Sequence, residues 1–238
     1  MKFKTYTITY IFFILVILSG YISVLKDYLI IITIHEFGHV FFLFLFKRKI
    51  KRIELYPFGL IIKDDALINS NIFQEFLITI GGILSQVIFR YCYLIPNNLA
   101  TLNSINNYIM FFNIIPIYPL DGYRILLSFT SYIFPYKYSL WIINTISVIF
   151  IIILAFSKSY SLFVVLFLAI KLVTNCKNSK YLWNKFILEH IIYDLNFKRN
   201  KFIKGNNPRK MFRSCNHTFE IGNNLVCEKN VLRNFIDK

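Results

Sequence analysis

The sequence has little charge, little glycine and few cysteines, and each of these shortages argues against a class of protein. Only 16% of the 238 residues are charged and 56% are hydrophobic, and the mean hydropathy is +0.54. Soluble domains carry about 25% charged residues, so the composition indicates a polytopic membrane protein. The 8 glycines against 26 phenylalanines suit helices that face lipid. The four cysteines have no CxxC spacing, so neither a zinc ribbon nor a disulfide framework is indicated.

Acidic residues are also scarce, and 27 Lys and Arg against 12 Asp and Glu give a formal net charge of +15. A charge of this size is often a sign of nucleic-acid binding, but its distribution points elsewhere. Fourteen of the basic residues lie between residue 171 and the C-terminus, and five lie within residues 47–52. Both segments flank hydrophobic runs, as the positive-inside rule predicts for cytoplasmic loops. We therefore expect the lipid bilayer, and no nucleic acid, as a partner.

Hydrophobic runs of membrane-spanning length predict six transmembrane helices. Their approximate ranges are 8–25, 28–46, 72–94, 108–134, 138–156 and 160–173. The fourth run is longer than one span needs and contains Pro116, Pro119 and Gly122, which predicts a helix broken within the membrane. The first run is similar to a signal peptide, but a second span follows within a few residues, so we expect a retained helix. Six crossings and the basic loops place both termini in the cytoplasm.

Two segments outside these runs have a different pattern. Residues 53–62 are too short to cross as a helix and contain a proline and a glycine, which favours strand–turn–strand or a re-entrant loop. Residues 176–238 are basic, with an amphipathic helix predicted at 181–196 and too little chain beyond it for an independent domain. The predicted fold is therefore an all-α polytopic membrane protein with a strand-like loop. Its two parts are a transmembrane domain at 1–175 and a basic cytoplasmic tail at 176–238.

The segment His35–His39 reads His-Glu-Phe-Gly-His and lies inside the second apolar run. Ionisable side chains at membrane depth cost at least about 2.5–3.5 kcal/mol each, so their presence indicates a function. On a helix His35 and His39 share one face and can bind a single metal ion. Glu36 is then placed to accept a proton from a water molecule at that metal, as in the His-Glu-x-x-His arrangement of zinc peptidases. The alternative is a structural group whose members are satisfied by hydrogen bonds inside a helical bundle.

A catalytic zinc site needs a third protein ligand besides the two histidines. The carboxylates that follow the motif and precede the tail are Glu54, Asp64, Asp65, Glu75 and Asp121. Only Asp121 lies within a hydrophobic segment away from the span ends, at the break in the fourth run. An Asp-Gly turn at a cytoplasmic boundary is the alternative explanation for this residue. Beside two intramembrane histidines a ligand is favoured, since a neutral zinc site would remove the burial cost of both groups.

Residues Asn113–Gly122 read Asn-Ile-Ile-Pro-Ile-Tyr-Pro-Leu-Asp-Gly and follow the first motif by about eighty residues. Together the two motifs resemble the site-2 protease family of intramembrane zinc metalloproteases, most closely its sporulation subgroup. The resemblance extends over the predicted transmembrane part and covers the tail only loosely. It implies one zinc ion per chain, held by His35, His39 and Asp121, with Glu36 as the catalytic base.

The resemblance also indicates which residues meet the substrate. Asn113, Pro116 and Pro119 would hold the broken helix and position the substrate. A substrate helix must unwind locally, because its own hydrogen bonds block attack on the peptide bond. The strand-like segment, with Phe58 and Gly59, would bind the unwound chain by adding it as a strand.

The sequence departs from the family at two places near these motifs. Many members have Gly-Pro and a later Asn in the third span, where this chain has Gly82-Ile83 and Gln86. Asp121-Gly122 is followed by Tyr123, where a second Gly is common. Relatives often carry a nucleotide-sensing cytoplasmic domain after the last span, and the tail here is too short for a complete one. We therefore expect the metal and the base to be retained, and the packing around them to differ.

By this resemblance the expected function is that of a zinc metalloendopeptidase in regulated intramembrane proteolysis, in a bacterial cell membrane. The expected substrate is a membrane-associated protein, foremost a pro-sigma factor, with an anti-sigma factor or a remnant signal peptide as alternatives. Membrane-protein regulators are further expected partners. Two rival functions remain open. One is a membrane peptidase of the heat-shock type, with Glu189 or Glu75 as the third ligand. The other is a non-enzymatic scaffold or transporter with a structural His/Glu/Asp cluster.

Overall fold

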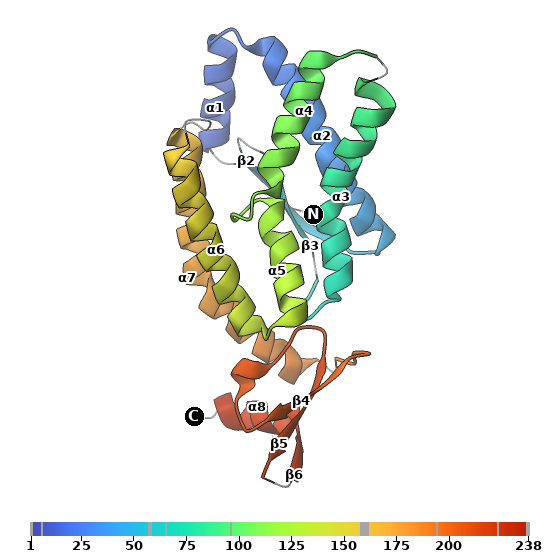
Figure 1. Ribbon diagram of the computed structural model, residues 1–238, viewed down its shortest axis with the longest axis vertical. Helices are drawn as coiled ribbons and strands as arrows, with labels where there is room; N and C mark the ends of the chain where they lie inside the picture. Colours follow the sequence, from blue (N-terminus) through green and yellow to red (C-terminus); the bar gives the residue numbers. More distant parts are fainter. Residues whose placement is uncertain are drawn as a thin grey trace. The chain divides into compact units, whose positions relative to one another are not determined.

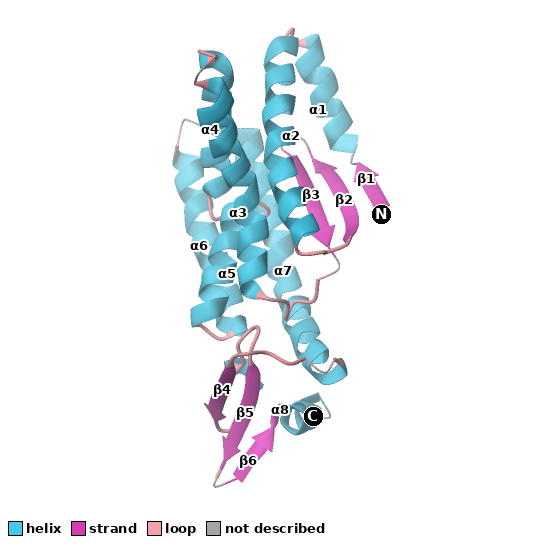
Figure 2. Cartoon of the chain, turned by 90° about the vertical axis from the view of Figure 1, so that its right-hand side faces the viewer, coloured by secondary structure: helices cyan, strands magenta, loops and turns pink. Residues whose placement is uncertain are grey.

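The computed structural model describes residues 2–5, 7–56, 59–64, 66–95, 97–157, 162–193, 195–222 and 224–236. The chain divides into two compact units. The first unit comprises Met1–Ala66 and Leu77–Ile115, and the second comprises Leu67–Phe76 and Pro116–Lys238. Each unit combines helices with one three-stranded sheet (Figure 1, Figure 2).

The first unit contains one short helix, three longer helices and an N-terminal sheet. The helices are α1 (Thr7–Leu18), α2 (Ile22–Leu45), α3 (Ile72–Phe89), which ends in the π-helical turn η1 (Arg90–Leu94), and α4 (Ala100–Ile114). The strands are β1 (Lys2–Thr5), β2 (Ile50–Tyr56) and β3 (Gly59–Asp64). β2 lies in the middle, parallel to β1 and antiparallel to β3, with Ile53 opposite Ile62. The two predicted strands are thus confirmed, and residues 57 and 58 between them lie outside the described residues.

Two glycines allow the backbones of α2 and α3 to touch. A Cβ atom on Gly38 would collide with the carbonyl oxygen of Gly81, and a Cβ atom on Gly81 would lie 2.7 Å from the carbonyl oxygen of Gly38. Small residues at helix crossings permit this approach in membranes, where packing replaces the hydrophobic effect between helices. The close contact fixes the face of α3 that lies against the His-Glu-x-x-His segment of α2.

The second unit contains three apolar helices followed by a small α/β tail. The helices are α5 (Asp121–Ile133), α6 (Tyr136–Phe156) and α7 (Leu162–Ile192), and α8 (Glu228–Ile236) lies at its C-terminal end. The strands are β4 (Asn200–Lys204), β5 (Asn216–Ile221) and β6 (Asn224–Cys227), with β5 in the middle, parallel to β4 and antiparallel to β6. One hydrophobic core joins α6, α7, the sheet and α8, and it includes Leu140, Phe186, Phe219 and Leu232.

The tail also fastens the segment Leu67–Phe76, in which α3 begins. Glu189 of α7 accepts hydrogen bonds from the backbone N–H groups of Ile68 and Asn69, both at 3.0 Å. Arg213, which is buried, donates to the carbonyl oxygen of Ile68 at 2.7 Å and pairs with Glu75 at 2.8 Å. These contacts explain why the segment belongs to the second unit although its neighbours in the sequence belong to the first.

The number of predicted spans is only partly supported. Four helical segments of the described chain are long and apolar enough to cross a membrane: Ile22–Leu45, Ile72–Leu94, Tyr136–Phe156 and Leu162–Ile192. The first predicted span corresponds to α1, which has only 12 residues. The fourth consists of α4 and α5, separated by residues 115–120, so the predicted break is confirmed.

Two further predictions need correction. The sixth span and the amphipathic helix were predicted as separate elements, whereas α7 is one helix of 31 residues. The all-α description is incomplete, because the tail adds a parallel and an antiparallel strand pair to the predicted strand-like loop. The boundary at residue 175 between a membrane domain and a tail stays a prediction.

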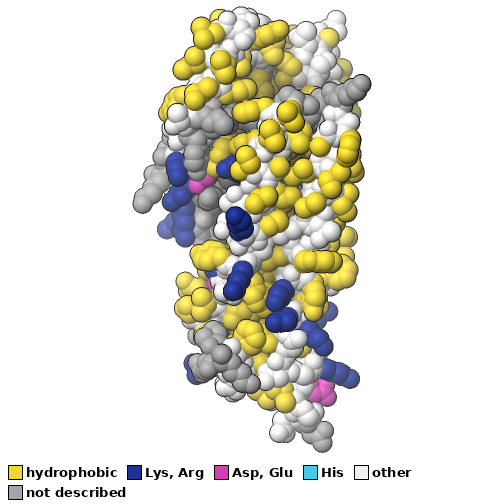
Figure 3. Space-filling model, turned by 90° about the vertical axis from the view of Figure 1, so that its left-hand side faces the viewer, with side chains coloured by type: hydrophobic (Ala, Val, Ile, Leu, Met, Phe, Trp, Pro, Cys, Tyr) yellow, Lys and Arg dark blue, Asp and Glu magenta, His cyan; other side chains and the backbone are white. Residues whose placement is uncertain are grey.

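Hydrophobic side chains are widely exposed on the long helices. Phe156 of α6 is 86% exposed, and Trp141 on the same helix is 69% exposed. Figure 3 shows that hydrophobic side chains cover much of one face, while Lys and Arg gather in separate groups. Apolar surfaces of this extent do not remain in contact with water in soluble monomers. The protein is therefore an integral membrane protein.

Candidate metal centre

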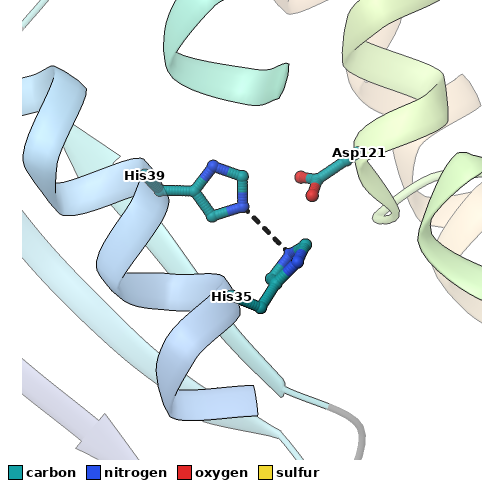
Figure 4. Close-up of side chains that lie close together, drawn as sticks. All are labelled: His35, His39 and Asp121. Carbon is teal, nitrogen blue, oxygen red and sulfur yellow. Dashed lines mark hydrogen bonds between the residues drawn. The ribbon is translucent and has the colours of Figure 1, made fainter. Parts of the chain in front are cut away.

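The two histidines of the first motif lie on one face of α2. His35 and His39 are both buried, and their Nε2 atoms are 3.1 Å apart (Figure 4). One helical turn separates them, and the rings meet edge to face with centroids 4.7 Å apart. Tetrahedral zinc with Zn–N distances of about 2.0–2.1 Å separates two nitrogen ligands by roughly 3.3 Å. The observed spacing fits two ligands of one ion.

The hydrogen bonds on the far side of each ring decide which nitrogen carries the proton. His39 Nδ1 is 2.8 Å from the carbonyl oxygen of Ile78, which can only accept, so Nδ1 is the donor. His35 Nδ1 lies 2.9 Å from Oε1 of Gln86 and donates to it in the same way. Both Nε2 atoms therefore present lone pairs to each other. Two lone pairs at 3.1 Å repel each other, whereas a cation between them would be bound by both. The two nitrogen donors therefore fit a metal ion.

Helix α3 leaves room for the rings because residue 82 is glycine. A Cβ atom on Gly82 would lie 2.5 Å from Nε2 of His39 and 2.6 Å from Cε1 of His35. Ordinary van der Waals contact begins at 3.4 Å. The imidazoles thus occupy the volume that any larger residue at this position would fill.

The predicted catalytic base lies beside the turn of the strand-like segment. Glu36 follows His35 on α2 and is 8% exposed. A Cβ atom on Gly59, the first residue of β3, would be 3.7 Å from Oε1 of Glu36. Gly59 has φ +145°, a conformation that favours glycine. The hairpin therefore reaches the carboxylate of the predicted base. Phe58, the other residue predicted to bind substrate here, lies outside the described residues.

The predicted third ligand begins a helix in the second unit. Asp121 is the first residue of α5, where a carboxylate is stabilised by the helix dipole. Pro116 and Pro119 lie in the non-helical residues before it, and Asn113 lies in the last turn of α4, half-buried. His35, His39 and Asp121 form a group that could hold one metal ion (Figure 4).

A peptidase of the heat-shock type would use Glu189 or Glu75 as the third metal ligand, but both carboxylates form hydrogen bonds to other groups. Glu189 binds the backbone of Ile68 and Asn69, and Glu75 pairs with Arg213. Neither belongs to a metal-compatible group in the part of the chain that the structure describes. Asp121 is therefore the better candidate for the third ligand.

Two partners of the histidines had no assigned role in the sequence analysis. Gln86 was considered only as a departure from the family. Its role could have been predicted, because it is an amide on an apolar helix, one turn after Gly82. The carbonyl group of Ile78 could not have been found, because a main-chain acceptor leaves no trace in the residue type.

A second group, His190, His217 and Glu228, has the composition of a metal site. Its hydrogen bonds argue against one. The backbone N–H of Phe212 donates to Nε2 of His217 at 2.9 Å, so the proton of that ring is on Nδ1, which donates to Glu228 at 3.1 Å. Nδ1 of His190 is 3.2 Å from the other carboxylate oxygen. Burial raises the pKa of Glu228, but hydrogen bonds from the two imidazoles outweigh it and lower the pKa to about 2. We interpret the group as an imidazole–carboxylate bridge within the tail.

Comparisons with known proteins agree with this fold and these motifs. No protein-family model matches the sequence. The chain has the fold of the site-2 protease from Methanocaldococcus jannaschii, with a TM-score of 0.54 and 23% identity over 82% of this chain and 93% of that one. It is also 28% identical to stage IV sporulation protein FB of Bacillus subtilis over an alignment of 207 residues, which covers 79% of this chain and 71% of that protein. The chain is therefore similar in fold to a site-2 protease and in sequence to a sporulation protein.

Proposed function

We propose that the protein is an intramembrane zinc metalloprotease that hydrolyses a peptide bond in or near the membrane. The observation that carries this proposal is the pair of buried Nε2 atoms, 3.1 Å apart, from the residue before Glu36 and the residue three after it on a membrane-length helix. His35, His39 and Asp121 would hold one zinc ion. When bound, zinc would supply Lewis acidity that activates water at neutral pH and polarises the scissile carbonyl.

The chain's own residues supply the proton transfers. Glu36 accepts a proton as the water oxygen attacks the scissile carbonyl carbon, and it returns that proton to the amide nitrogen as the C–N bond breaks. Its burial beside apolar helices keeps other water away from the carboxylate. Gln86 and the Ile78 carbonyl keep both histidines in the tautomer that has its lone pair on Nε2.

The sheet of the first unit supports a mode of substrate binding. β3 forms one edge of this sheet in the described chain, and Gly59, with which it begins, lies beside Glu36. An unwound substrate segment added along β3 would run toward the catalytic base. Phe58, Asn113, Pro116 and Pro119 remain proposed substrate-positioning residues.

The substrate class follows from the similarity to a sporulation protein. We propose a membrane-associated protein, foremost a pro-sigma factor, cleaved in regulated intramembrane proteolysis. The proposed setting is a bacterial cell membrane with six crossings, both termini in the cytoplasm and membrane-protein regulators as partners.

The test combines zinc content with cleavage of a co-expressed membrane-bound pro-sigma factor. Wild-type protein purified in detergent should hold about one zinc per chain and should cleave. Glu36→Gln should keep the zinc and lose cleavage, because the amide cannot accept a proton. Asp121→Asn should lose or greatly weaken zinc binding. Wild-type protein without zinc after reconstitution, or cleavage by Glu36→Gln, would refute the proposal in favour of a membrane scaffold.

A further inference from the structure

Tyr123 lies in the first turn of α5, two residues after Asp121, and its side chain is buried. Its hydroxyl donates to Oδ1 of Asn144 on α6 at 3.1 Å and accepts from Nδ2 of Asn175 on α7 at 2.7 Å. Nδ2 of Asn175 is also 3.2 Å from Oδ1 of Asn144. Ser179, one turn further on α7, accepts from Nδ2 of Asn144 at 2.9 Å. The hydroxyl of Tyr123 thus joins α5 to α6 and α7.

Residues 116–120 lead to Asp121, and their first residue, Pro116, also contacts α6. Ser147 of α6, three residues after Asn144, has its Oγ 2.7 Å from the carbonyl oxygen of Pro116 and 2.8 Å from that of Ile143 on its own helix, so its one proton is shared between the two. This carbonyl precedes α5 and has no helical partner of its own, so the serine satisfies it within the bundle. Residues 116–123 are therefore attached to α6 at both ends, with Asp121 between the two attachments.

Helical geometry converts this attachment into a direction for the carboxylate. Successive residues of an α-helix are rotated by about 100°, so residues 121 and 123 point to nearly opposite sides of the first turn. With Tyr123 bonded to α6 and α7, the rotation of this turn is fixed, and the side chain of Asp121 points away from those two helices. Without the hydroxyl, the first turn of α5 would no longer be bonded to α6 and α7, and the side-chain amides of Asn144 and Asn175 would each lose one hydrogen bond.

We propose that Tyr123, acting through Asn144 and Asn175, is a positioning residue that orients Asp121 for metal ligation. The proposal rests on the proposed function, since it takes Asp121 as the third ligand. Tyr123 stands where a second glycine is common in site-2 proteases. A glycine has no hydroxyl, so Asn144 and Asn175 would each lose the hydrogen bond that Tyr123 forms with them. Supporting contacts of this kind change metal affinity by about 10–100-fold, and we expect about 10-fold because Tyr123 acts through the backbone.

The experiment is a double-mutant cycle on zinc affinity, measured by competition with a chelator in the detergent-purified chain. Tyr123→Phe should raise the zinc Kd about tenfold in the wild-type background. In the Asp121→Asn background, measured at higher zinc concentration, it should change the Kd by less than about twofold. The matched control is Thr130→Val, which removes an α5 hydroxyl that bonds only within its own helix, to the carbonyl oxygens of Leu126 and Leu127. This control should leave the Kd unchanged.

Each outcome has a distinct meaning. An unchanged Kd in Tyr123→Phe, with zinc affinity still dependent on Asp121, would overturn the positioning role and leave the proposed function intact. An equal loss in both backgrounds would show general destabilisation and would also overturn it. Absence of zinc from the wild type refutes the proposed function itself. If Tyr123→Phe does not fold, Ser147→Ala tests the other attachment in the same cycle, with the same dependence on Asp121 expected.

Discussion

The substitution Gly82→Ala tests the geometry of the histidine pair directly. The added methyl carbon would lie 2.5 Å from Nε2 of His39, about 1 Å inside ordinary contact, which begins at 3.4 Å. The rings cannot retreat without lengthening the 2.8 Å bond to Ile78 and the 2.9 Å bond to Gln86. Changes in the groups that orient metal ligands alter metal affinity by about 10–100-fold. We therefore expect a zinc affinity about 100-fold weaker, together with about 1–3 kcal/mol lower stability from overpacking.

The assay is zinc competition beside thermal unfolding, with Gly81→Ala for comparison. A Cβ atom on Gly81 meets the Phe42 ring at 2.5 Å and the Gly38 backbone, and it has no histidine atom among its nearest neighbours. Both variants should lose stability, and the larger loss of zinc affinity should belong to Gly82→Ala. Wild-type zinc affinity in folded Gly82→Ala would show that the rings are not packed against α3 as described, and the reasoning would fail.

Three further predictions concern the hairpin and the tail. Gly59→Val should lower cleavage at least tenfold with unchanged zinc content. The valine side chain would lie beside Glu36, and the φ of +145° at this position is unsuited to valine. A parallel loss of zinc would contradict this prediction. The pKa of Glu228 is lowered from 4.5 to about 2, so its carboxylate contributes about 3 kcal/mol of stability above pH 4.5, and this is lost as the pH falls toward 2. Thermal unfolding from pH 7 to 2 should show this additional loss in the wild type relative to Glu228→Ala. Arg213→Met should destabilise the tail by about 3 kcal/mol, because it leaves Glu75 without its buried partner, and limited proteolysis should detect the change.

Local patterns in the sequence were sufficient for the parts of the site that lie on one element. The spacing of His35 and His39 sets their shared face through the helical period alone. The break before Asp121 follows from two prolines, and the hairpin follows from a proline and a glycine between short apolar runs. Each of these features depends on fewer than about ten consecutive residues, which is the range over which propensity is informative.

The course of α7 was mispredicted because a polar face was mistaken for the end of a span. Asn175 and Ser179 lie one turn apart in a polar stretch, and hydropathy places such residues in water. In the structure both bond across to α6, so the helix continues through them to Ile192. The parallel pairing of β4 and β5 was missed for a related reason. These strands are joined by residues 205–215 and meet only through contacts that are distant in sequence, whereas β5 and β6 are adjacent in the sequence and pair antiparallel.

The element that shapes the candidate metal centre is α3, although the sequence analysis placed the candidate ligands and base on α2 and at Asp121. Gly81 and Gly82 bring α3 against the motif, and Gln86 and the Ile78 carbonyl fix the tautomers of the two histidines. An acceptor at the correct distance is sufficient for this task, so a glutamine can serve where many relatives have asparagine. The first turn of α3 belongs by its contacts to the second unit, where Glu75 is bonded to Arg213 of the tail. Helix α3 therefore carries both Glu75, which pairs with Arg213, and the two acceptors that set the tautomers of the histidines.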